Sequence, residues 1–270
     1  MIAYLKEELK EEKDRILVDK KEGLLMNKPI IGIIPTVKLY VENDPYKDQY
    51  TFVNNYVKDV YSGGGIPFGI LPNDGDIDVN DLKLCDAFLI PGGSEVKPFI
   101  YKILDYAYEN KKPVLGICLG MQAMCIYSVM KDICIDKGIN VISDEERKIY
   151  EKIKEEDPIL SLLPDEIISN HSHIINRDNI DTARHFININ KGSLLSSFYD
   201  EDKISVVSLH KFYPLRTSSI LSLGATSHDG IIEAVENSDL MWIGTLYHPE
   251  VDINDNLIKK FVEKVGDKKW

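Results

Sequence analysis

The sequence has no long hydrophobic run, since no stretch approaches the roughly 18 consecutive apolar residues that a membrane-spanning helix needs. Its first residues, MIAYLKEELKEEKDRILVDKK, are rich in acids and lack the apolar centre of a secretory signal. We therefore expect a soluble protein of the cytoplasm that has no membrane partner.

Positive charge is also scarce, because 32 Lys and Arg residues stand against 44 Asp and Glu residues and leave a net charge of −12. A nucleic-acid surface needs clustered Lys and Arg to meet the phosphates. The composition therefore argues against a nucleic-acid partner, and the acidity is best explained as support for solubility.

Cysteine is rare as well, with four residues in the whole chain and no Cys-x-x-Cys pair. The four are Cys85, Cys118, Cys125 and Cys134. Without such pairs or a secretion signal, they predict reduced thiols and no disulfide framework. Their spacing matches no common zinc pattern, and His171 and His173 have no third ligand nearby, so we expect no metal site.

The chain does contain an alternation of short apolar runs and helical stretches. Continuous apolar runs predict strands that are buried on both faces, at residues 30–34, 66–71, 87–90 and 114–117. Helical patterns lie between them, near residues 52–62 and 97–110. Strands separated by helices of this length predict crossover connections and a parallel sheet.

The second half of the chain has a different pattern. A charged helix is predicted at residues 143–156, and a closing helix at 254–265. Short β segments are predicted between them, at residues 186–190, 204–209, 220–226, 231–235 and 241–247. With no repeat or linker in view, we expect one domain over residues 28–270. Residues 1–27 predict a charged helical extension whose thin apolar stripe could dock on the body or on a second subunit.

The most informative segment surrounds Cys118. A predicted strand runs directly into Gly116-Ile117-Cys118-Leu119-Gly120, and the residues that follow suit a helix. This is the thiol counterpart of the nucleophile elbow, a sharp strand-to-helix turn that lifts the reactive side chain above the sheet. A thiol at a helix N-terminus faces unpaired N–H groups, and these favour the thiolate. Cys118 is therefore our candidate nucleophile.

Backbone N–H groups near this elbow could hold a tetrahedral oxyanion. Leu119 follows the nucleophile directly, and Gly93 lies in the segment Pro91-Gly92-Gly93 after the preceding predicted strand. The carboxyl ends of strands are where open α/β sheets place their ligands. We therefore expect the amides of Leu119 and Gly93 to act as oxyanion donors.

A thiolate also needs a base nearby and an acid that orients that base. Of the six histidines, His248 alone ends a strong apolar strand and leads into Pro249-Glu250. This pattern predicts a triad of Cys118, His248 and Glu250. His210 has two possible roles at this point: it contacts the substrate, or it is a turn residue without a part in the chemistry.

Three motifs occur in order along the chain: Pro91-Gly92-Gly93, Gly-Ile-Cys-Leu-Gly-Met-Gln around Cys118, and Tyr-His-Pro-Glu around His248. Together they resemble the class I glutamine amidotransferase family. The segments Ser208-Leu209-His210 and Ser-His-Asp-Gly-Ile-Ile-Glu-Ala at residues 227–234 resemble its γ-glutamyl-γ-aminobutyrate hydrolase branch, a peptidase-like group. The resemblance covers roughly residues 28–266.

The resemblance implies a flavodoxin-like, mostly parallel central sheet with helices on both faces and an additional β-rich C-terminal part. It also implies hydrolysis of a small γ-glutamyl amide through a glutamyl thioester, with no metal or organic cofactor. The resemblance implies that Cys118 is the nucleophile, that His248 is the base and that Glu250 is the partner of that base. It further implies oxyanion or substrate contacts at Gly92, Gly93, Leu119, Gln122 and His210.

The chain departs from that branch around the expected substrate rim. The segment after Gly93 is shorter and lacks an Arg-Asp pair, residues 130–134 replace a glycine-rich turn, and Lys211-Phe212 follow His210. The substrate therefore stays open, and so does a homodimer. Two other functions remain as alternatives. One is a glutaminase subunit that delivers ammonia to a separate synthase, and the other is a non-catalytic thiol sensor or binding module on the same fold.

Overall fold

The structure is a computed structural model, and it describes residues 28–38, 49–73, 75–164 and 180–267. The predicted extension at residues 1–27 lies outside these ranges, as do His171 and His173. Its separation from a domain at residues 28–270 therefore stays a prediction. No helix in the described ranges is both long enough and apolar enough to cross a membrane.

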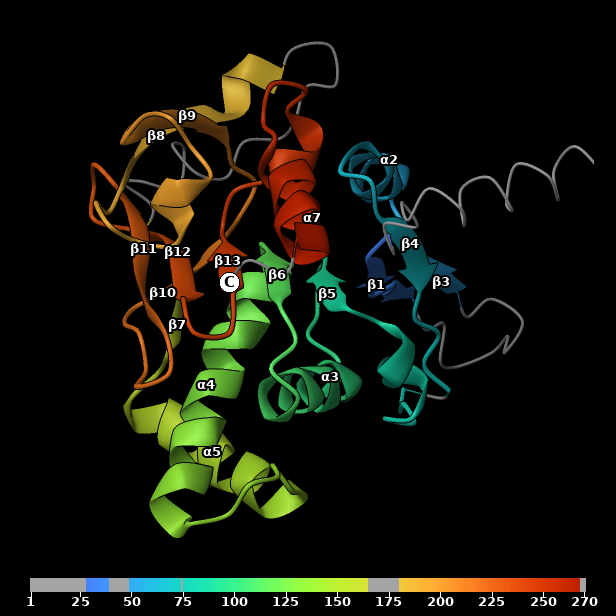
Figure 1. Ribbon diagram of the computed structural model, residues 1–270. Coiled ribbons are helices and arrows are strands. Elements are labelled where there is room, and N and C mark those ends of the chain that lie inside the picture. The colour runs from blue at the N-terminus through green and yellow to red at the C-terminus, as the bar shows by residue number, and fades with distance from the viewer. Residues whose placement is uncertain (1–27, 39–48, 74, 165–179, 268–270) are drawn as a thin grey trace, which may run out of the picture.

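A nine-stranded sheet runs through the centre of the protein, in the order β4-β1-β5-β6-β13-β12-β11-β8-β9 (Figure 1). Its first five strands pair in parallel, in the spatial order that is typical of flavodoxin-like sheets. These strands are β4 (Ile66–Gly69), β1 (Ile30–Ile33), β5 (Ala87–Ile90), β6 (Val114–Ile117) and β13 (Trp242–Thr245). The sequence predicted four of them as continuous apolar runs and β13 as a short β segment. The expectation that the run at residues 66–71 is buried on both faces is wrong, because β4 lies at the edge of the sheet and is mostly exposed.

Helices cover both faces of the parallel half (Figure 1). One face carries α2 (Asn54–Ser62) and α7 (Leu257–Asp267), which pack on each other and bury Tyr56, Val60 and Phe261. The other face carries α3 (Pro98–Glu109) and α4 (Leu119–Lys137), with α5 (Asp144–Glu156) against α4. The expectation of an α/β fold with helices on both faces is therefore confirmed.

Antiparallel strands extend the sheet beyond β13, which confirms the expected β-rich C-terminal part. They are β12 (Ile232–Asn237), β11 (Ser222–Ser227), β8 (Arg184–Ile189) and β9 (Lys203–Val207). Two further pairs form small separate sheets that the sequence did not predict, namely β2 (Thr36–Lys38) with β3 (Gln49–Thr51) and β7 (Leu160–Leu162) with β10 (Phe212–Pro214). Each of these strands has three residues, which is too short for a hydrophobic period to show.

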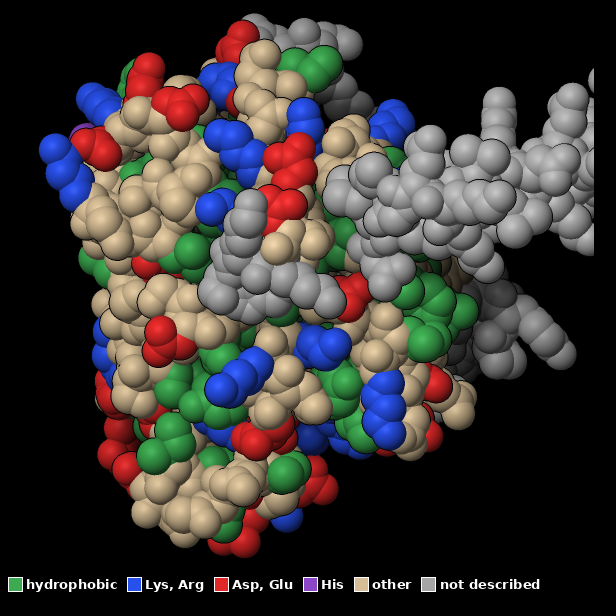
Figure 2. Space-filling view, viewed as in Figure 1, with side chains coloured by type: hydrophobic (Ala, Val, Ile, Leu, Met, Phe, Trp, Pro, Cys, Tyr) green, Lys and Arg blue, Asp and Glu red, His purple; other side chains and the backbone are tan. Residues whose placement is uncertain are grey.

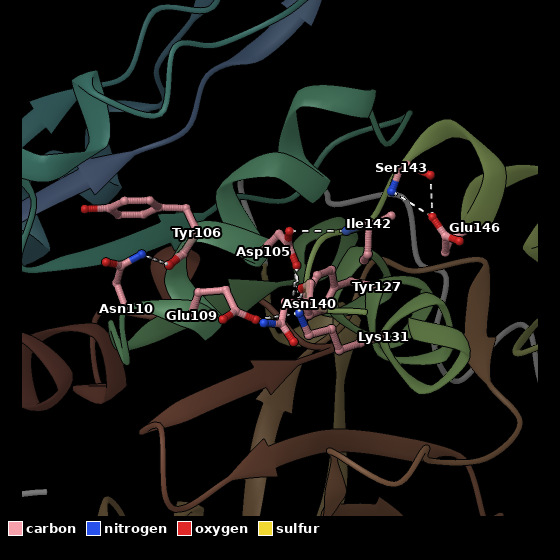
Figure 3. A network of polar contacts seen from close by, with 10 residues as sticks. All are labelled: Asp105, Tyr106, Glu109, Asn110, Tyr127, Lys131, Asn140, Ile142, Ser143 and Glu146. Atoms are coloured by element: carbon pink, nitrogen blue, oxygen red, sulfur yellow. Dashed lines mark hydrogen bonds and ion pairs between the residues drawn. The ribbon is translucent and has the colours of Figure 1, made fainter. Parts of the chain in front are cut away.

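Helix α4 runs on without a break through residues 130–134. The Lys131 side chain there is only 2% exposed, and its Nζ lies 3.1 Å from Asp105 Oδ1 and 2.7 Å from Glu109 Oε1 (Figure 3). The Tyr127 hydroxyl donates to the same Asp105 oxygen. This buried network ties α4 to α3.

We expect Lys131→Met to lower the free energy of unfolding by about 3–5 kcal/mol, because it leaves the Asp105 carboxylate buried without its cation. Urea unfolding measures the change. The matched control is Lys154→Met, since Lys154 and its carboxylate partner Glu151 are both exposed and an exposed ion pair contributes little to stability. Equal losses in the two variants would contradict a structural role for the buried pair.

Candidate active site

Cys118 occupies the one-residue turn between β6 and α4, since the strand ends at Ile117 and the helix begins at Leu119. Its backbone has φ 51° and ψ −101°, a conformation that is strained for a residue with a Cβ. The Cys118 N–H donates to the Thr245 carbonyl at 2.7 Å, which fixes the turn to β13. The chain therefore has the local geometry of a nucleophile elbow.

Two glycines allow this turn to pack closely. A Cβ on Gly120 would lie 2.1 Å from the Ile90 carbonyl oxygen, and one on Gly116 would lie 2.8 Å from the Gly120 carbonyl carbon. Both of these atoms belong to the backbone, so they could not move aside for a Cβ as the end of a flexible side chain could. Glycine at these two positions lets α4 start directly against the ends of β5 and β6.

His248 and Glu250 meet the elbow from the segment that follows β13. The His248 N–H donates to the Val207 carbonyl at 2.8 Å, and Glu250 lies in a short 3₁₀ turn at Pro249–Val251. The imidazole Nδ1 lies 2.7 Å from Glu250 Oε1, and both side chains are buried. The pair can therefore act as a base and its orienting acid.

The His248 imidazole also lies beside the Cys118 side chain, since both border the Cα of Gly92. Burial by itself lowers the pKa of this imidazole, but the Glu250 carboxylate, together with the neighbouring Cys118 side chain, raises the pKa well above its usual value. The site is thus built to hold a proton on the imidazole, and this is the form that can protonate a leaving amine.

The expected oxyanion donors lie beside this group. A Cβ on Gly92 would lie 2.8 Å from His248 Cε1 and 3.5 Å from Cys118 Cβ, so the loop after β5 reaches both side chains. A Cβ on Gly93 would lie 2.9 Å from a Leu119 side-chain carbon, and these two residues line one small cavity with Ser94. The N–H of Leu119 is the first of helix α4, where backbone donors are unpaired.

Gln122 and His210 lie in different surroundings. Gln122 is in the first turn of α4, and its N–H donates to the Cys118 carbonyl at 3.0 Å. His210 is buried, and its Nε2 lies 3.5 Å from Glu233 Oε1. The Nε2 of His185 lies at the same distance from that oxygen. Contact of Gln122 or His210 with a substrate stays a prediction.

His185, His210 and Glu233 form a buried cluster that sequence reasoning missed, because it joins β8, the loop after β9 and β12. In the described ranges, it is the one group of His, Cys, Asp and Glu side chains whose ligand atoms, all within 4.8 Å of one another, could hold a metal ion. Separations of 3.5 Å equally suit imidazole–carboxylate pairing. His185 Nε2 also hydrogen-bonds Ser208 Oγ at 2.8 Å, as expected of a polar structural cluster.

Sequence reasoning also missed two residues of α2 that contact Glu250. The Tyr56 hydroxyl donates to Glu250 Oε1 at 2.7 Å, and Asn55 Nδ2 donates to the Glu250 carbonyl at 2.9 Å. The signal that could have found Tyr56 is its place one turn before Val60, on the buried face of an otherwise polar helix. No motif links that face to residues almost two hundred positions later.

The other three cysteines are buried free thiols. Burial raises the pKa of Cys125 to about 12. Burial also raises the pKa of Cys85 to about 11. In Cys134 the pKa is raised too, mainly by burial. A thiolate is disfavoured in all three, as the sequence predicted for core cysteines. Of the four thiols, Cys118 alone lies in a strand-to-helix turn beside an imidazole.

Known proteins resemble this chain over most of its length. A glutamine amidotransferase-like protein of Rickettsia prowazekii is 28% identical, with 86% of this chain and 94% of that protein covered. A CTP synthase of Thermosipho africanus is also 28% identical, over 63% of this chain but only 33% of its own length. This chain therefore matches about a third of the CTP synthase.

The fold has a solved counterpart in the glutaminase domain of the Trypanosoma brucei CTP synthase. The TM-score is 0.60 at 15% identity, and the match covers 90% of this chain and 95% of that one. The family model described as Peptidase C26 matches residues 29–105 and 101–250, which contain the elbow, the loop after β5 and the His-Glu pair. On that match the chain belongs to the Peptidase C26 family, whose relatives here are glutamine amidotransferase-like, and the resemblance drawn from its motifs is confirmed.

Proposed function

We propose that this protein hydrolyses the side-chain amide of glutamine or of a small γ-glutamyl compound, through a thioester on Cys118. The observation that carries the proposal is the His248 imidazole, which lies beside the Cys118 side chain across Gly92 and pairs through Nδ1 with Glu250 Oε1 at 2.7 Å. This is the arrangement of a nucleophile, a base and an orienting acid.

In the first half of the reaction, the Cys118 thiolate attacks the amide carbonyl carbon. The N–H groups of Leu119 and Gly93 stabilise the oxyanion of the tetrahedral intermediate. The protonated His248 then gives its proton to the leaving nitrogen, the carbon–nitrogen bond breaks, and a glutamyl thioester with free amine remains.

In the second half, the neutral His248 imidazole takes a proton from water, and the resulting hydroxide attacks the thioester carbonyl. The carbon–sulfur bond breaks, the acid leaves, and Cys118 returns as thiolate beside an imidazolium. Glu250 stays ionised throughout and holds the imidazole by its Nδ1. The residues of this chain account for every proton that moves.

Family membership and the named activities of the relatives support amide hydrolysis of the glutaminase kind. The narrower substrate class rests on the segments around His210 and Glu233, which resemble the γ-glutamyl-γ-aminobutyrate hydrolase branch. We therefore propose a γ-glutamyl amide as the preferred substrate, with glutamine as the competing one.

One experiment separates these substrates. The full chain is incubated with glutamine, γ-glutamyl-γ-aminobutyrate and γ-glutamyl-p-nitroanilide, and the release of glutamate is measured for each. A preference for γ-glutamyl-γ-aminobutyrate over glutamine by kcat/KM is expected. No glutamate release from any of the three would contradict the proposed function.

A second candidate is a glutaminase unit that supplies ammonia to a synthase. The observation in its favour is that the CTP synthase relative is three times as long as the part that this chain matches. Glutaminase activity that is weak alone and rises when a copurifying synthase is added would favour this candidate. Full activity of the isolated chain on γ-glutamyl amides would favour the first.

Surface charge suits a small-molecule substrate better than a nucleic acid. Figure 2 shows Lys and Arg side chains scattered among Asp and Glu side chains over one face of the protein. Phosphate backbones need basic side chains that cluster along a track. We therefore keep a small amide as the expected ligand.

A further inference from the structure

The first turn of α2 holds the Glu250 segment at two points. Asn55 Nδ2 donates to the Glu250 carbonyl oxygen at 2.9 Å, and the Tyr56 hydroxyl donates to Glu250 Oε1 at 2.7 Å. The Tyr56 side chain is fully inside the core between α2 and the sheet. A helix that is distant in sequence thus fixes both the backbone and the carboxylate of Glu250.

The same hydroxyl also reaches the loop after β5. It accepts a hydrogen bond from the Gly92 N–H at 3.3 Å while it donates to Glu250. Burial and the nearby Glu250 charge keep the pKa of Tyr56 well above its usual value, so the hydroxyl retains the proton that it donates. One oxygen atom therefore connects the carboxylate of the triad with the loop that carries Gly93.

The two hydrogen bonds on the Glu250 carboxylate converge on one oxygen. His248 Nδ1 and the Tyr56 hydroxyl each lie 2.7 Å from Oε1, whereas Oε2 is buried without a hydrogen-bond partner in the part of the chain that the structure describes. A buried carboxylate held by two donors has one favoured orientation. Removing one donor leaves His248 as the sole contact that fixes it.

We propose that Tyr56 is a positioning residue for the amide hydrolysis, because its hydroxyl fixes the Glu250 carboxylate against His248 and ties the Gly92 loop to that carboxylate. The inference rests on the proposed function. Tyr56 acts through Glu250 and the Gly92 loop, the two groups to which its hydroxyl is hydrogen-bonded.

The first test is Tyr56→Phe, which keeps the buried ring and removes only the hydroxyl. We expect kcat on γ-glutamyl-p-nitroanilide to fall about 10- to 100-fold, the range for one charge-assisted hydrogen bond, with KM changed by less than about twofold. The KM should hold because the stronger contact that is lost, at 2.7 Å, is with Glu250, which orients the base, while the contact with Gly92 is long at 3.3 Å. An unchanged kcat would overturn the inference.

The matched control is Tyr127→Phe. The Tyr127 hydroxyl also donates to a buried carboxylate, Asp105 Oδ1 at 3.1 Å, but in the network between α3 and α4 (Figure 3). This variant should lose stability to a similar degree and keep the kcat of the unmodified protein. An equal fall of kcat in both variants would show that Tyr56 matters only for the general integrity of the core.

A double-mutant cycle tests whether Tyr56 acts through Glu250. In the Glu250→Ala background, the hydroxyl has no carboxylate to position, so adding Tyr56→Phe should lower kcat by no more than about twofold. A full 10- to 100-fold further loss in that background would overturn the assignment, since the two residues would then act independently.

A substrate-free measurement separates failure of this inference from failure of the proposed function. The rate at which iodoacetamide alkylates Cys118 is followed against pH in the unmodified, Tyr56→Phe and Tyr127→Phe proteins. We expect Tyr56→Phe alone to shift the profile, because His248 sits between Glu250 and the thiol. Identical profiles in all three would overturn the inference even if none of the proteins hydrolysed an amide.

Discussion

Cys118→Ala is expected to abolish turnover, with a loss on the order of 10⁴–10⁶ in kcat, because no other group in the site can form the thioester. The structure gives this residue the strained turn, the helix N-terminus and the imidazole that activate a thiol. The measurement is glutamate release from glutamine and from γ-glutamyl-p-nitroanilide. Near-normal activity in this variant would rule out the mechanism.

The matched control is Cys125→Ala, which removes a thiol from the same helix. Cys125 is buried in the core and burial raises its pKa to about 12, so it carries no reactive thiolate. This variant should keep its kcat and lose only some stability through the small cavity that it creates. A glutamine-analogue electrophile should label the unmodified protein and Cys125→Ala once, and Cys118→Ala not at all.

The labelling also distinguishes an enzyme from a thiol sensor. In a hydrolase, γ-glutamyl compounds occupy the site and protect Cys118 from the electrophile in a saturable way. A sensor would still react with peroxide, because oxidation needs only an accessible thiolate. Its thiol would not, however, be protected by γ-glutamyl compounds. Saturable protection is the expected result.

The parallel half of the fold could be predicted from the sequence because its inner strands β1, β5, β6 and β13 are almost entirely buried. Runs such as Val114–Ile117 are continuously apolar, and the helices between them have the length of crossover connections. The strand pairs β2 with β3 and β7 with β10 could not, because three residues show no period.

The candidate triad could be predicted because it depends on local motifs. Gly116 and Gly120 mark the elbow around Cys118, and Pro249 links His248 to Glu250 in one turn. The supporting residues could not, because their contacts join distant segments. Tyr56 meets Glu250 across 194 positions, and no periodicity in α2 carries information about its partner.

The same distinction applies to His210. The sequence left it between a substrate contact and a turn residue, whereas the structure places its Nε2 3.5 Å from the Glu233 carboxylate, in a cluster with His185. The three belong to separate strands or loops, so their meeting follows from the order of β8, β9, β11 and β12 in the sheet. Sheet order on that side depends on antiparallel pairing that no local pattern specifies.

Glu250→Gln is expected to lower kcat by roughly 10²–10⁴, the range for the loss of a group that orients a catalytic base. The amide is nearly the same size as the carboxylate, so packing is kept. It has no charge, however, and it can present an N–H where Oε1 now accepts from His248 Nδ1 and the Tyr56 hydroxyl. The imidazole then loses both its orientation and its preferred tautomer.

The pH dependence of kcat/KM should also change in Glu250→Gln. Against the opposing effect of burial, the Glu250 charge raises the pKa of His248 well above its usual value, so the imidazolium that protonates the leaving amine survives to higher pH. Replacing Glu250 with Gln removes that charge and lowers the pKa. The alkaline limb of kcat/KM should therefore move to lower pH in Glu250→Gln, and a limb that stays in place or moves to higher pH would contradict the assigned role.

Glu236→Gln is the matched control, because it makes the same chemical change at another buried carboxylate. Glu236 lies in β12, in the antiparallel half of the sheet, and accepts from the N–H groups of Leu194 and Leu195 at 2.6 and 2.9 Å. We expect this variant to lose stability while its kcat and the alkaline limb stay unchanged. A shift of the limb confined to Glu250→Gln would tie the pKa of the imidazole to the one carboxylate that lies 2.7 Å from its Nδ1.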